Sequence, residues 1–158
     1  MCNYLAKMIL TSVLLGTISV LVSAGVSIGP IGPRVLPDYP WVGRAGVGAD
    51  FMVRCSIANG RVQAVRVVEA SIDWNGREPV PADMEDPQDP GPAFFQSIEQ
   101  ALKQWTFDSE TTGDFEIRIR FRSILGSEGD YIDYRYGSSD LFLPRRIDIV
   151  AHHSLNID

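Results

Sequence analysis

The residues of this chain that could do chemistry are few and far apart. Its two histidines, His152 and His153, are adjacent near the end of the sequence, and Cys55 lies far from both. A hydrolytic site needs a nucleophile, a base and an orienting group within reach of one another. No segment of the sequence places these residue types together. We therefore predict that the protein is not an enzyme and that it uses no cofactor.

Cys55 falls on the apolar side of an alternating stretch, together with Phe51, Val53 and Ile57. A free cysteine in such a position behaves as a small hydrophobic side chain. The other cysteine, Cys2, precedes a hydrophobic N-terminal segment, so the sequence predicts no internal disulfide framework. We expect Cys55 to be buried, and the alternative is a reactive thiol.

Acidic side chains gather in residues 72–92, which also contain several prolines. Carboxylates could bind Ca²⁺ weakly here, because clustered oxygens suit hard cations; they are Asp83, Glu85, Asp86 and Asp89. Their spacing is not that of an EF-hand, and the histidine pair could bind a transition metal only adventitiously. We predict no functional metal site. A long loop of this composition does not easily pack a core, and such loops are either functional or disordered.

Length and charge narrow the remaining classes of function. The 158 residues favour one domain. The net charge of -6 argues against a nucleic-acid partner, because proteins that bind nucleic acid usually carry a basic patch.

The N-terminus has the pattern of a segment that directs export. Lys7 precedes an uncharged apolar run, and Val22-Ser23-Ala24 supplies the small residues at which a signal peptidase cuts. We interpret residues 1–24 as a secretory signal peptide. The alternative is an uncleaved membrane anchor, since no charge occurs from Met8 to Pro33 and this stretch could span a bilayer. Both interpretations place the rest of the chain outside the cytoplasm.

The middle of the chain has clear secondary-structure patterns. Residues 51–57 alternate apolar and polar side chains, Asn59-Gly60 is a strong hairpin signal, and residues 61–70 have the composition of a return strand. Residues 115–122 alternate strictly, which predicts a strand with one buried and one solvated face. Between them, residues 93–105 carry apolar side chains at helical spacing: Phe94, Ile98, Ala101, Leu102 and Trp105.

The order of these signals resembles the C-terminal domain of TonB, the energy-transducing protein of Gram-negative bacteria. Tyr39-Pro40 matches the Tyr-Pro that often opens the family's domain. The family's Gly-x-Val-x-x-Val-x-Val hairpin is similar to residues 60–67, and its Ala-Val-x-x-Trp-x-Phe helix end is similar to residues 101–107. The resemblance implies an α+β fold: a small two-layer sandwich in which a helix packs on one face of a three-stranded antiparallel sheet.

The residue patterns and the resemblance together predict how the chain is divided. The expected parts are the signal or anchor (1–24), a linker (25–38), the TonB C-terminal-like domain (39–125) with its acidic loop (72–92), and a C-terminal extension (126–158).

In that family the domain binds an extended segment of an outer-membrane receptor, which adds a strand to the edge of the sheet. An edge can do this because its unpaired N–H and C=O groups supply main-chain hydrogen bonds. The resemblance makes residues 115–122 the expected edge strand. The side chains expected to contact the partner are Glu116, Arg118, Arg120, Arg122, Tyr39 and Pro40. The alternative is that these charges form a solvated face that protects the edge from aggregation.

Taken with the export pattern, the resemblance implies a periplasmic protein-binding module associated with TonB-dependent transport across the outer membrane. Its partner would be a segment of an outer-membrane receptor or another envelope protein. One alternative is an energy transducer anchored in the inner membrane and facing the periplasm. Another is a structural envelope protein that self-associates, for example as a homodimer. The linker of residues 25–38 reaches at most about 50 Å, which argues against a transducer that crosses the periplasm alone.

Overall fold

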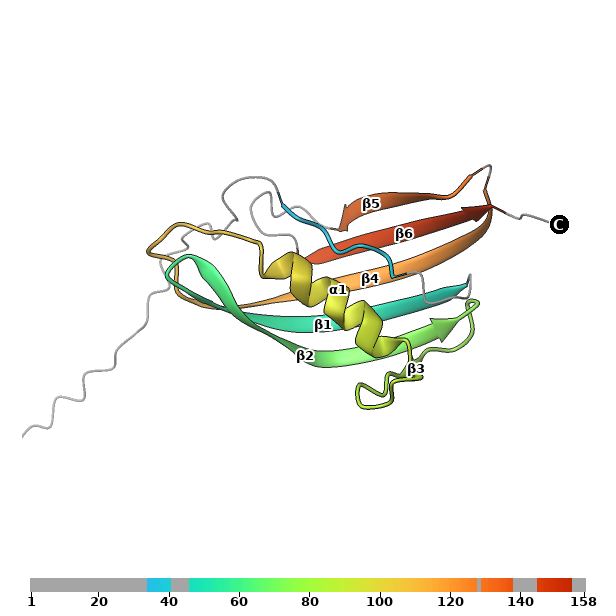
Figure 1. The fold of residues 1–158 in the computed structure, drawn as a ribbon, viewed down its shortest axis with the longest axis horizontal. Helices are drawn as coiled ribbons and strands as arrows, with labels where there is room; N and C mark the ends of the chain where they lie inside the picture. Colours follow the sequence, from blue (N-terminus) through green and yellow to red (C-terminus); the bar gives the residue numbers. More distant parts are fainter. Residues whose placement is uncertain (1–33, 41–45, 128, 138–144, 155–158) are drawn as a thin grey trace, which may run out of the picture.

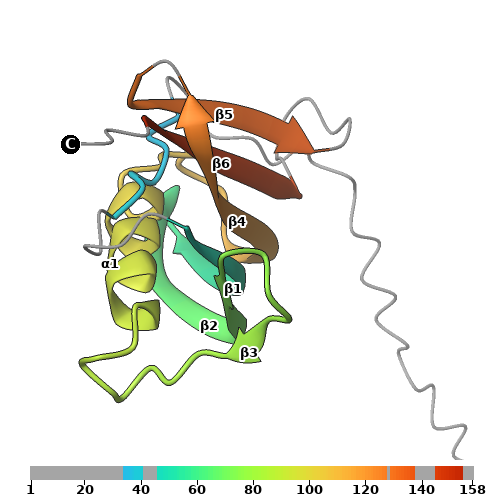
Figure 2. The same ribbon diagram turned by 90° about the vertical axis from the view of Figure 1, so that its right-hand side faces the viewer.

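The computed structural model describes residues 34–40, 46–127, 129–137 and 145–154. These residues form an α+β fold, in which the helix α1 (Gly91–Leu102) packs on one face of a six-stranded mixed sheet (Figures 1 and 2). The expected α+β class is confirmed. The expectation of a three-stranded antiparallel sheet is wrong, because the sheet has six strands and one of its pairings is parallel.

The sheet has the strand order β3-β2-β1-β4-β6-β5. The strands are β1 (Val47–Ala58), β2 (Arg61–Trp74), β3 (Val80–Pro81), β4 (Gly113–Ser127), β5 (Tyr131–Gly137) and β6 (Arg146–Ser154). β1 pairs antiparallel with β2 and with β4, β6 runs parallel to β4, and β5 is antiparallel to β6. The residues expected to form an extension beyond the domain therefore supply two strands of the same sheet.

The β1–β2 hairpin turns at Asn59 and Gly60, as the sequence predicts. Their φ angles are 52° and 71°, the left-handed conformations that a tight two-residue hairpin turn requires. A Cβ on Gly60 would lie 2.6 Å from the carbonyl oxygens of Phe107 and Asp108. Glycine is therefore needed here both for its backbone conformation and for the close approach of the chain after α1.

β2 does not follow the simple alternation of a flat strand. Its register against β1 shifts twice, so that Gln63 and Val68 are extra residues without a partner on β1. Such bulges change which side chains face the core. Val62 and Val65 are both buried, and Val67 packs partly buried against the same core, although strict alternation would separate Val62 from the other two.

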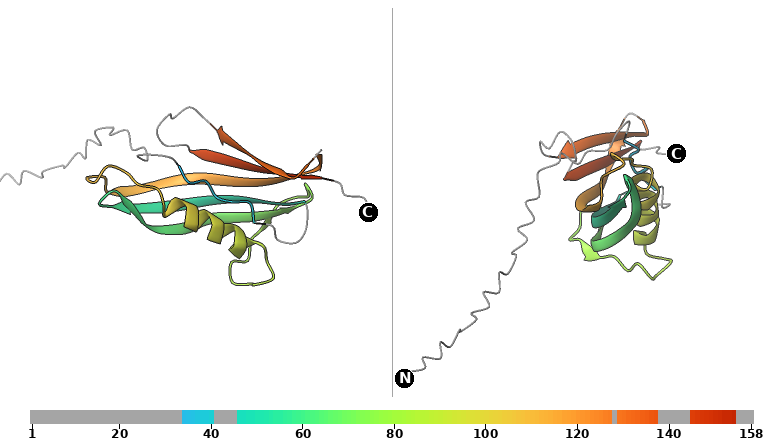
Figure 3. Two further views of the ribbon diagram at one scale, coloured as in Figure 1. Left: turned by 45° about the horizontal axis from the view of Figure 1, so that its top comes forward. Right: turned by 90° about the vertical axis from the view of Figure 1, so that its left-hand side faces the viewer.

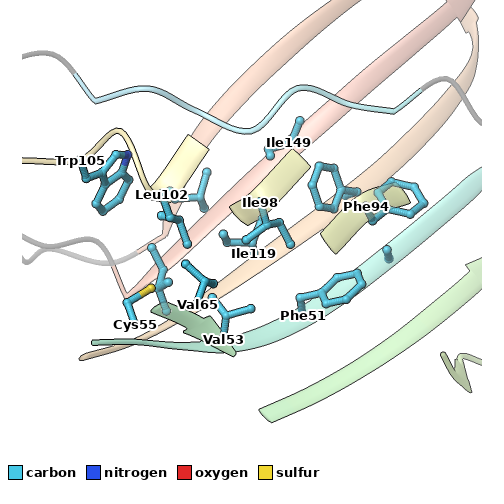
Figure 4. Close-up of a cluster of buried hydrophobic side chains, with 14 of the residues drawn as sticks. Phe51, Val53, Cys55, Val65, Phe94, Ile98, Leu102, Trp105, Ile119 and Ile149 are labelled. Atoms are coloured by element: carbon cyan, nitrogen blue, oxygen red, sulfur yellow. The ribbon is translucent and has the colours of Figure 1, made fainter. Parts of the chain in front are cut away.

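The core lies between α1 and the sheet (Figure 4). α1 buries the face that its periodicity predicts, through Phe94, Ile98, Ala101 and Leu102. The helix ends at Leu102, earlier than the predicted residue 105, and the N–H of Trp105 donates to the Leu102 carbonyl in a tight turn. The sheet contributes side chains from β1, β2, β4 and β6, among them Phe51, Val53, Val65, Ile119 and Ile149.

Residues 34–40, which we call the N-terminal strap, lie along the same face of the sheet as α1 (Figures 1 and 3). The Trp105 indole N–H donates to the carbonyl of Val35 at 2.7 Å, and the Ser97 hydroxyl donates to the carbonyl of Asp38 at 2.6 Å. Most of the strap belongs to the segment expected to be a linker. It is instead fixed to α1 and to the turn that follows it.

The acidic segment of residues 72–92 is held by local hydrogen bonds in addition to the short strand β3. Asp83 accepts from the backbone N–H groups of Glu85 and Asp86 at 3.0 and 3.2 Å, and Asp89 accepts from those of Asp83 and Gly91 at 3.0 and 2.7 Å. Aspartate favours such turns because its short side chain reaches nearby backbone groups. Ala82 and Met84 pack against the core, so the segment does contribute to packing.

The predicted leader, residues 1–24, lies outside the described residues. Among the residues that are described, no helix has the length and apolar character needed to cross a membrane.

Candidate functional site

β4 lies in the interior of the sheet and not at its edge. β1 pairs along one side of it, and β6 pairs along the other from Arg118 to Ser127. The prediction that residues 115–122 form the edge strand is therefore wrong. Its alternation predicted the buried face of the strand correctly, but alternation does not say how many neighbours a strand has.

The charged side chains of β4 lie on the face of the sheet opposite α1, which we call the open face. Arg118 donates to Asp50 at 2.7 Å, and Arg120 contacts the other oxygen of Asp50 at 3.2 Å. The Nε of Arg54 on β1 donates to Glu116 at 2.9 Å. The hydrogen bond and charge of Asp50 raise the pKa of Arg118 above its usual value. Three of the four predicted contact residues on β4 are thus paired within the chain.

Tyr39 is a core residue rather than a contact residue at the surface. Its ring is only 2% exposed and packs edge-to-face against Phe94 and Phe121, at centroid distances of 5.5 and 6.1 Å. Its hydroxyl donates to the carbonyl of Val47. Burial raises the pKa of Tyr39 to about 12. Tyr39 fixes the strap to the sheet, while Pro40 beside it is half-buried.

One outer edge of the sheet belongs to β5, and the other belongs to β2 except where the two-residue strand β3 covers it. On its outer side, β2 pairs at Ser71 and Ile72 with the two residues of β3, and Arg61 forms an isolated bridge with Thr106. The Ala70 carbonyl also accepts from the N–H of Ala82 at 3.1 Å. Between these points, residues 62–69 pair only with β1 among the described residues. β5 is shorter, and its charged residues Asp133 and Arg135 form an ion pair with each other at 2.9 Å.

The open face contains a hollow of about 340 Å³ at the end of β1 nearest β3. Its lining includes two carboxylates, two guanidinium groups and a glycine: Asp50, Asp73, Arg120, Arg122 and Gly48. Ser71, Ser123, Pro79 and Ile124 complete most of its wall. The sequence did not indicate this site, because its residues come from three strands and a loop that are far apart along the chain.

The residues singled out for catalysis or metal binding do not come together. His152 stacks on Tyr131 at a centroid distance of 4.1 Å, whereas His153 faces the core beside Tyr39 at 6.0 Å. Cys55 is fully buried, as predicted, and its burial raises the pKa of the thiol to about 12. Within the described part of the chain, no group of three or more His, Cys, Asp or Glu residues could hold a metal ion.

Comparison with known proteins finds no matching family model, no matching curated protein and no matching solved structure. The resemblance to the TonB C-terminal domain therefore stays a prediction from the order of motifs.

Raising the pH is expected to destabilise the protein through Cys55 and Tyr39. The ordinary pKa values of 9.0 and 10.0 are raised to about 12 for both groups in the folded state. Between these values the unfolded chain binds fewer protons than the native chain, so the free energy of unfolding falls as pH rises. Urea unfolding should show this loss from about pH 9 to about pH 12. In a Cys55→Ala variant the loss should begin only near pH 10, and an unchanged profile would contradict the assignment.

Proposed function

We propose that this chain is a protein-binding module of the Gram-negative envelope that captures an extended peptide by strand addition at the outer edge of β2. The observation that supports this most directly is the free stretch of residues 62–69. Main-chain N–H and C=O groups along such an edge can bind an incoming strand without requiring a particular sequence. The bridge at Arg61 and the pairing with β3 limit this stretch at its two ends.

Side chains of β2 suggest which peptides would bind. Arg66 is exposed and lies opposite Arg54 on the open face, and it forms no ion pair among the described residues. Val68, at the bulge, is 45% exposed. Opposite charges on neighbouring strands stabilise pairing by about 0.2–1 kcal/mol per pair. We expect a partner segment that places an acidic residue beside Arg66 and an apolar residue beside Val68.

The finer proposal is a periplasmic module that resembles the TonB C-terminal domain and serves TonB-dependent transport. The order of hairpin, helix and alternating strand supports it, together with the export pattern of residues 1–24. The partner would then be a segment of an outer-membrane receptor or another envelope protein. An inner-membrane-anchored transducer is the alternative if the leader is retained.

Self-association through the same edge is the second candidate function. Arg66 and Glu69 both lie on the open face of β2, because they pair with Arg54 and Met52 of β1. Two copies of β2 in antiparallel pairing could set Arg66 of one copy opposite Glu69 of the other. Opposite charges in these positions would favour a symmetric dimer.

A Val68→Lys substitution is expected to weaken peptide binding by about tenfold or more, because a charged side chain on an edge strand opposes further pairing. The probes are synthetic peptides from the periplasmic N-terminal segments of the host's outer-membrane receptors. Binding is followed by calorimetry and by backbone amide exchange, which should slow within residues 62–69. Leu125→Lys is the matched control, because Leu125 is 48% exposed on β4 and lies away from this edge.

The proposal fails if none of these peptides binds, or if protection appears at β5 and not at β2. It also fails if Val68→Lys and Leu125→Lys reduce binding equally. Sedimentation of the free protein tests the second candidate. A dimer that Val68→Lys dissociates would assign the edge to self-association.

A further inference from the structure

A carboxylate and a guanidinium group face each other across Gly48 on the open face. Gly48 lies opposite Asp73 of β2, and the next residue, Ala49, lies opposite Phe121 of β4. Asp73, Gly48 and Arg122 are therefore neighbours in one row across β2, β1 and β4. Neighbouring strands are about 4.8 Å apart, so the backbones that carry the two charges are roughly 10 Å apart. Because Gly48 has no side chain, the space between them is open and forms part of the hollow of about 340 Å³.

Neither charge has a partner among the described residues. Oδ1 of Asp73 is buried without a hydrogen bond, and no ion pair involves Asp73 or Arg122. The next row of the sheet behaves differently, because Asp50 pairs with both Arg118 and Arg120. A buried carboxylate oxygen without a donor is costly, and native proteins rarely leave one unsatisfied. The Asp73–Arg122 row therefore presents a carboxylate and a guanidinium group, neither with a partner among the described residues, on the two sides of an open space, and Oδ2 of Asp73 is the carboxylate oxygen that lies toward it.

The chemistry of that group follows from the two ends. Asp73 can accept from a hydrogen-bond donor, preferably a cation, while the exposed Arg122 can donate to an anionic acceptor. A simple anion would leave Asp73 unpaired, and a simple cation would leave Arg122 unpaired. An ammonium group and a carboxylate on one small molecule satisfy both, with charge-assisted hydrogen bonds of about 2.8 Å at each end.

We propose that the hollow around Gly48 binds a small zwitterion of the amino-acid type, with its ammonium group on Asp73 and its carboxylate on Arg122. Ile124 and Pro79 give the hollow an apolar side, which suits an aliphatic side chain. Ser71 and Ser123 provide further polar lining. The site lies on the open face and not on the outer edge of β2, so it does not depend on the proposed peptide-binding function.

The test uses three probes of similar shape with the purified full-length chain. L-Leucine carries both charged groups, leucinamide lacks the carboxylate, and 4-methylpentanoate lacks the ammonium group. Leucine should bind and shift the backbone amide signals of Gly48 and its neighbours in NMR spectra. Removing either charged group from the ligand should weaken binding by about tenfold.

Variants of the protein should reproduce this pattern. Asp73→Asn and Arg122→Gln should each weaken leucine binding by about tenfold, because each removes one charge-assisted contact. Lys103→Gln is the control, since Lys103 pairs with Glu99 at the end of α1 and lies far from the hollow. It should leave leucine binding unchanged. Arg122 is exposed, so Arg122→Gln decides the matter if Asp73→Asn does not fold.

Three results would overturn the proposal. The first is the absence of any leucine-dependent shift at Gly48 at millimolar concentration. The second is binding of 4-methylpentanoate as tight as that of leucine, which would show an anion site only. The third is leucine binding that survives both Asp73→Asn and Arg122→Gln.

Discussion

Replacing Trp105 by alanine is expected to lower the free energy of unfolding by about 4 kcal/mol. The side chain is only 2% exposed and lies parallel to the ring of Phe115 at a centroid distance of 6.4 Å. Its N–H donates to the carbonyl of Val35 at 2.7 Å, so the substitution also removes one of the contacts that hold the strap. The loss therefore combines a core cavity with the loss of a part-buried hydrogen bond. Urea unfolding followed by far-ultraviolet circular dichroism measures it.

Trp74→Ala is the matched control, because Trp74 is only partly buried at the end of β2. We expect it to lose no more than about half as much stability, since less apolar area is removed from the core. Trp105→Phe keeps an aromatic ring and removes the hydrogen bond, with an expected loss of about 1–3 kcal/mol. Equal losses for Trp105→Ala and Trp74→Ala would contradict the structural role assigned to Trp105.

Replacing Ile149 by alanine is expected to cost about 3 kcal/mol, the second-largest effect. Ile149 is fully buried on β6 (Figure 4). It pairs with Phe121 of β4 on one side and with Tyr134 of β5 on the other. If β6 is part of the core, truncating Ile149 must lower the free energy of unfolding as much as truncating a core residue of a central strand. The measurement is the urea midpoint, with the slope of the transition as a check on two-state unfolding.

Ile124→Ala provides the comparison for this prediction. Ile124 lies on β4, the central neighbour of β6, but is 44% exposed. We expect a loss below about 1 kcal/mol, because the side chain is only partly removed from water. A similarly small loss for Ile149→Ala would show that the C-terminal strands are an appendage and do not belong to the folded core.

The position of β6 changes how strand addition can occur. The residues expected to receive a peptide were 115–122, and from Arg118 onward they are paired with β6 of the same chain. The ion pairs of Asp50 with Arg118 and Arg120 further engage these side chains within the sheet. Strand addition therefore requires a different edge, and β2 provides the longest free stretch that the structure describes.

Several features were predictable because their causes are local. Asn59-Gly60 specifies a tight turn through its own backbone preferences. The apolar stripe that includes Phe94 and Ile98 fixes which face of α1 is buried, and the alternation of residues 115–121 fixes the buried face of β4. Cys55 was predicted to be buried for the same reason.

Other features depend on contacts between distant residues, and no local pattern encodes them. The alternation of Ile147 and Ile149 predicts a strand but not a parallel position between β4 and β5. The bulges of β2 change which of its side chains face the core, and the amino-acid composition of the strand does not reveal them. Tyr39 matched a motif that opens a domain, and only packing against Phe94 and Phe121 showed it to be core.

The hollow at Gly48 is the clearest case of a site that only the tertiary structure decided. The sequence by itself determined the hairpin, the helix and the buried faces, because short-range preferences and periodicity govern them. Gly48, Asp73 and Arg122 lie in one row across the sheet because β1 lies between β2 and β4. That order is set by long-range pairing and burial in the sheet, which local preferences do not specify.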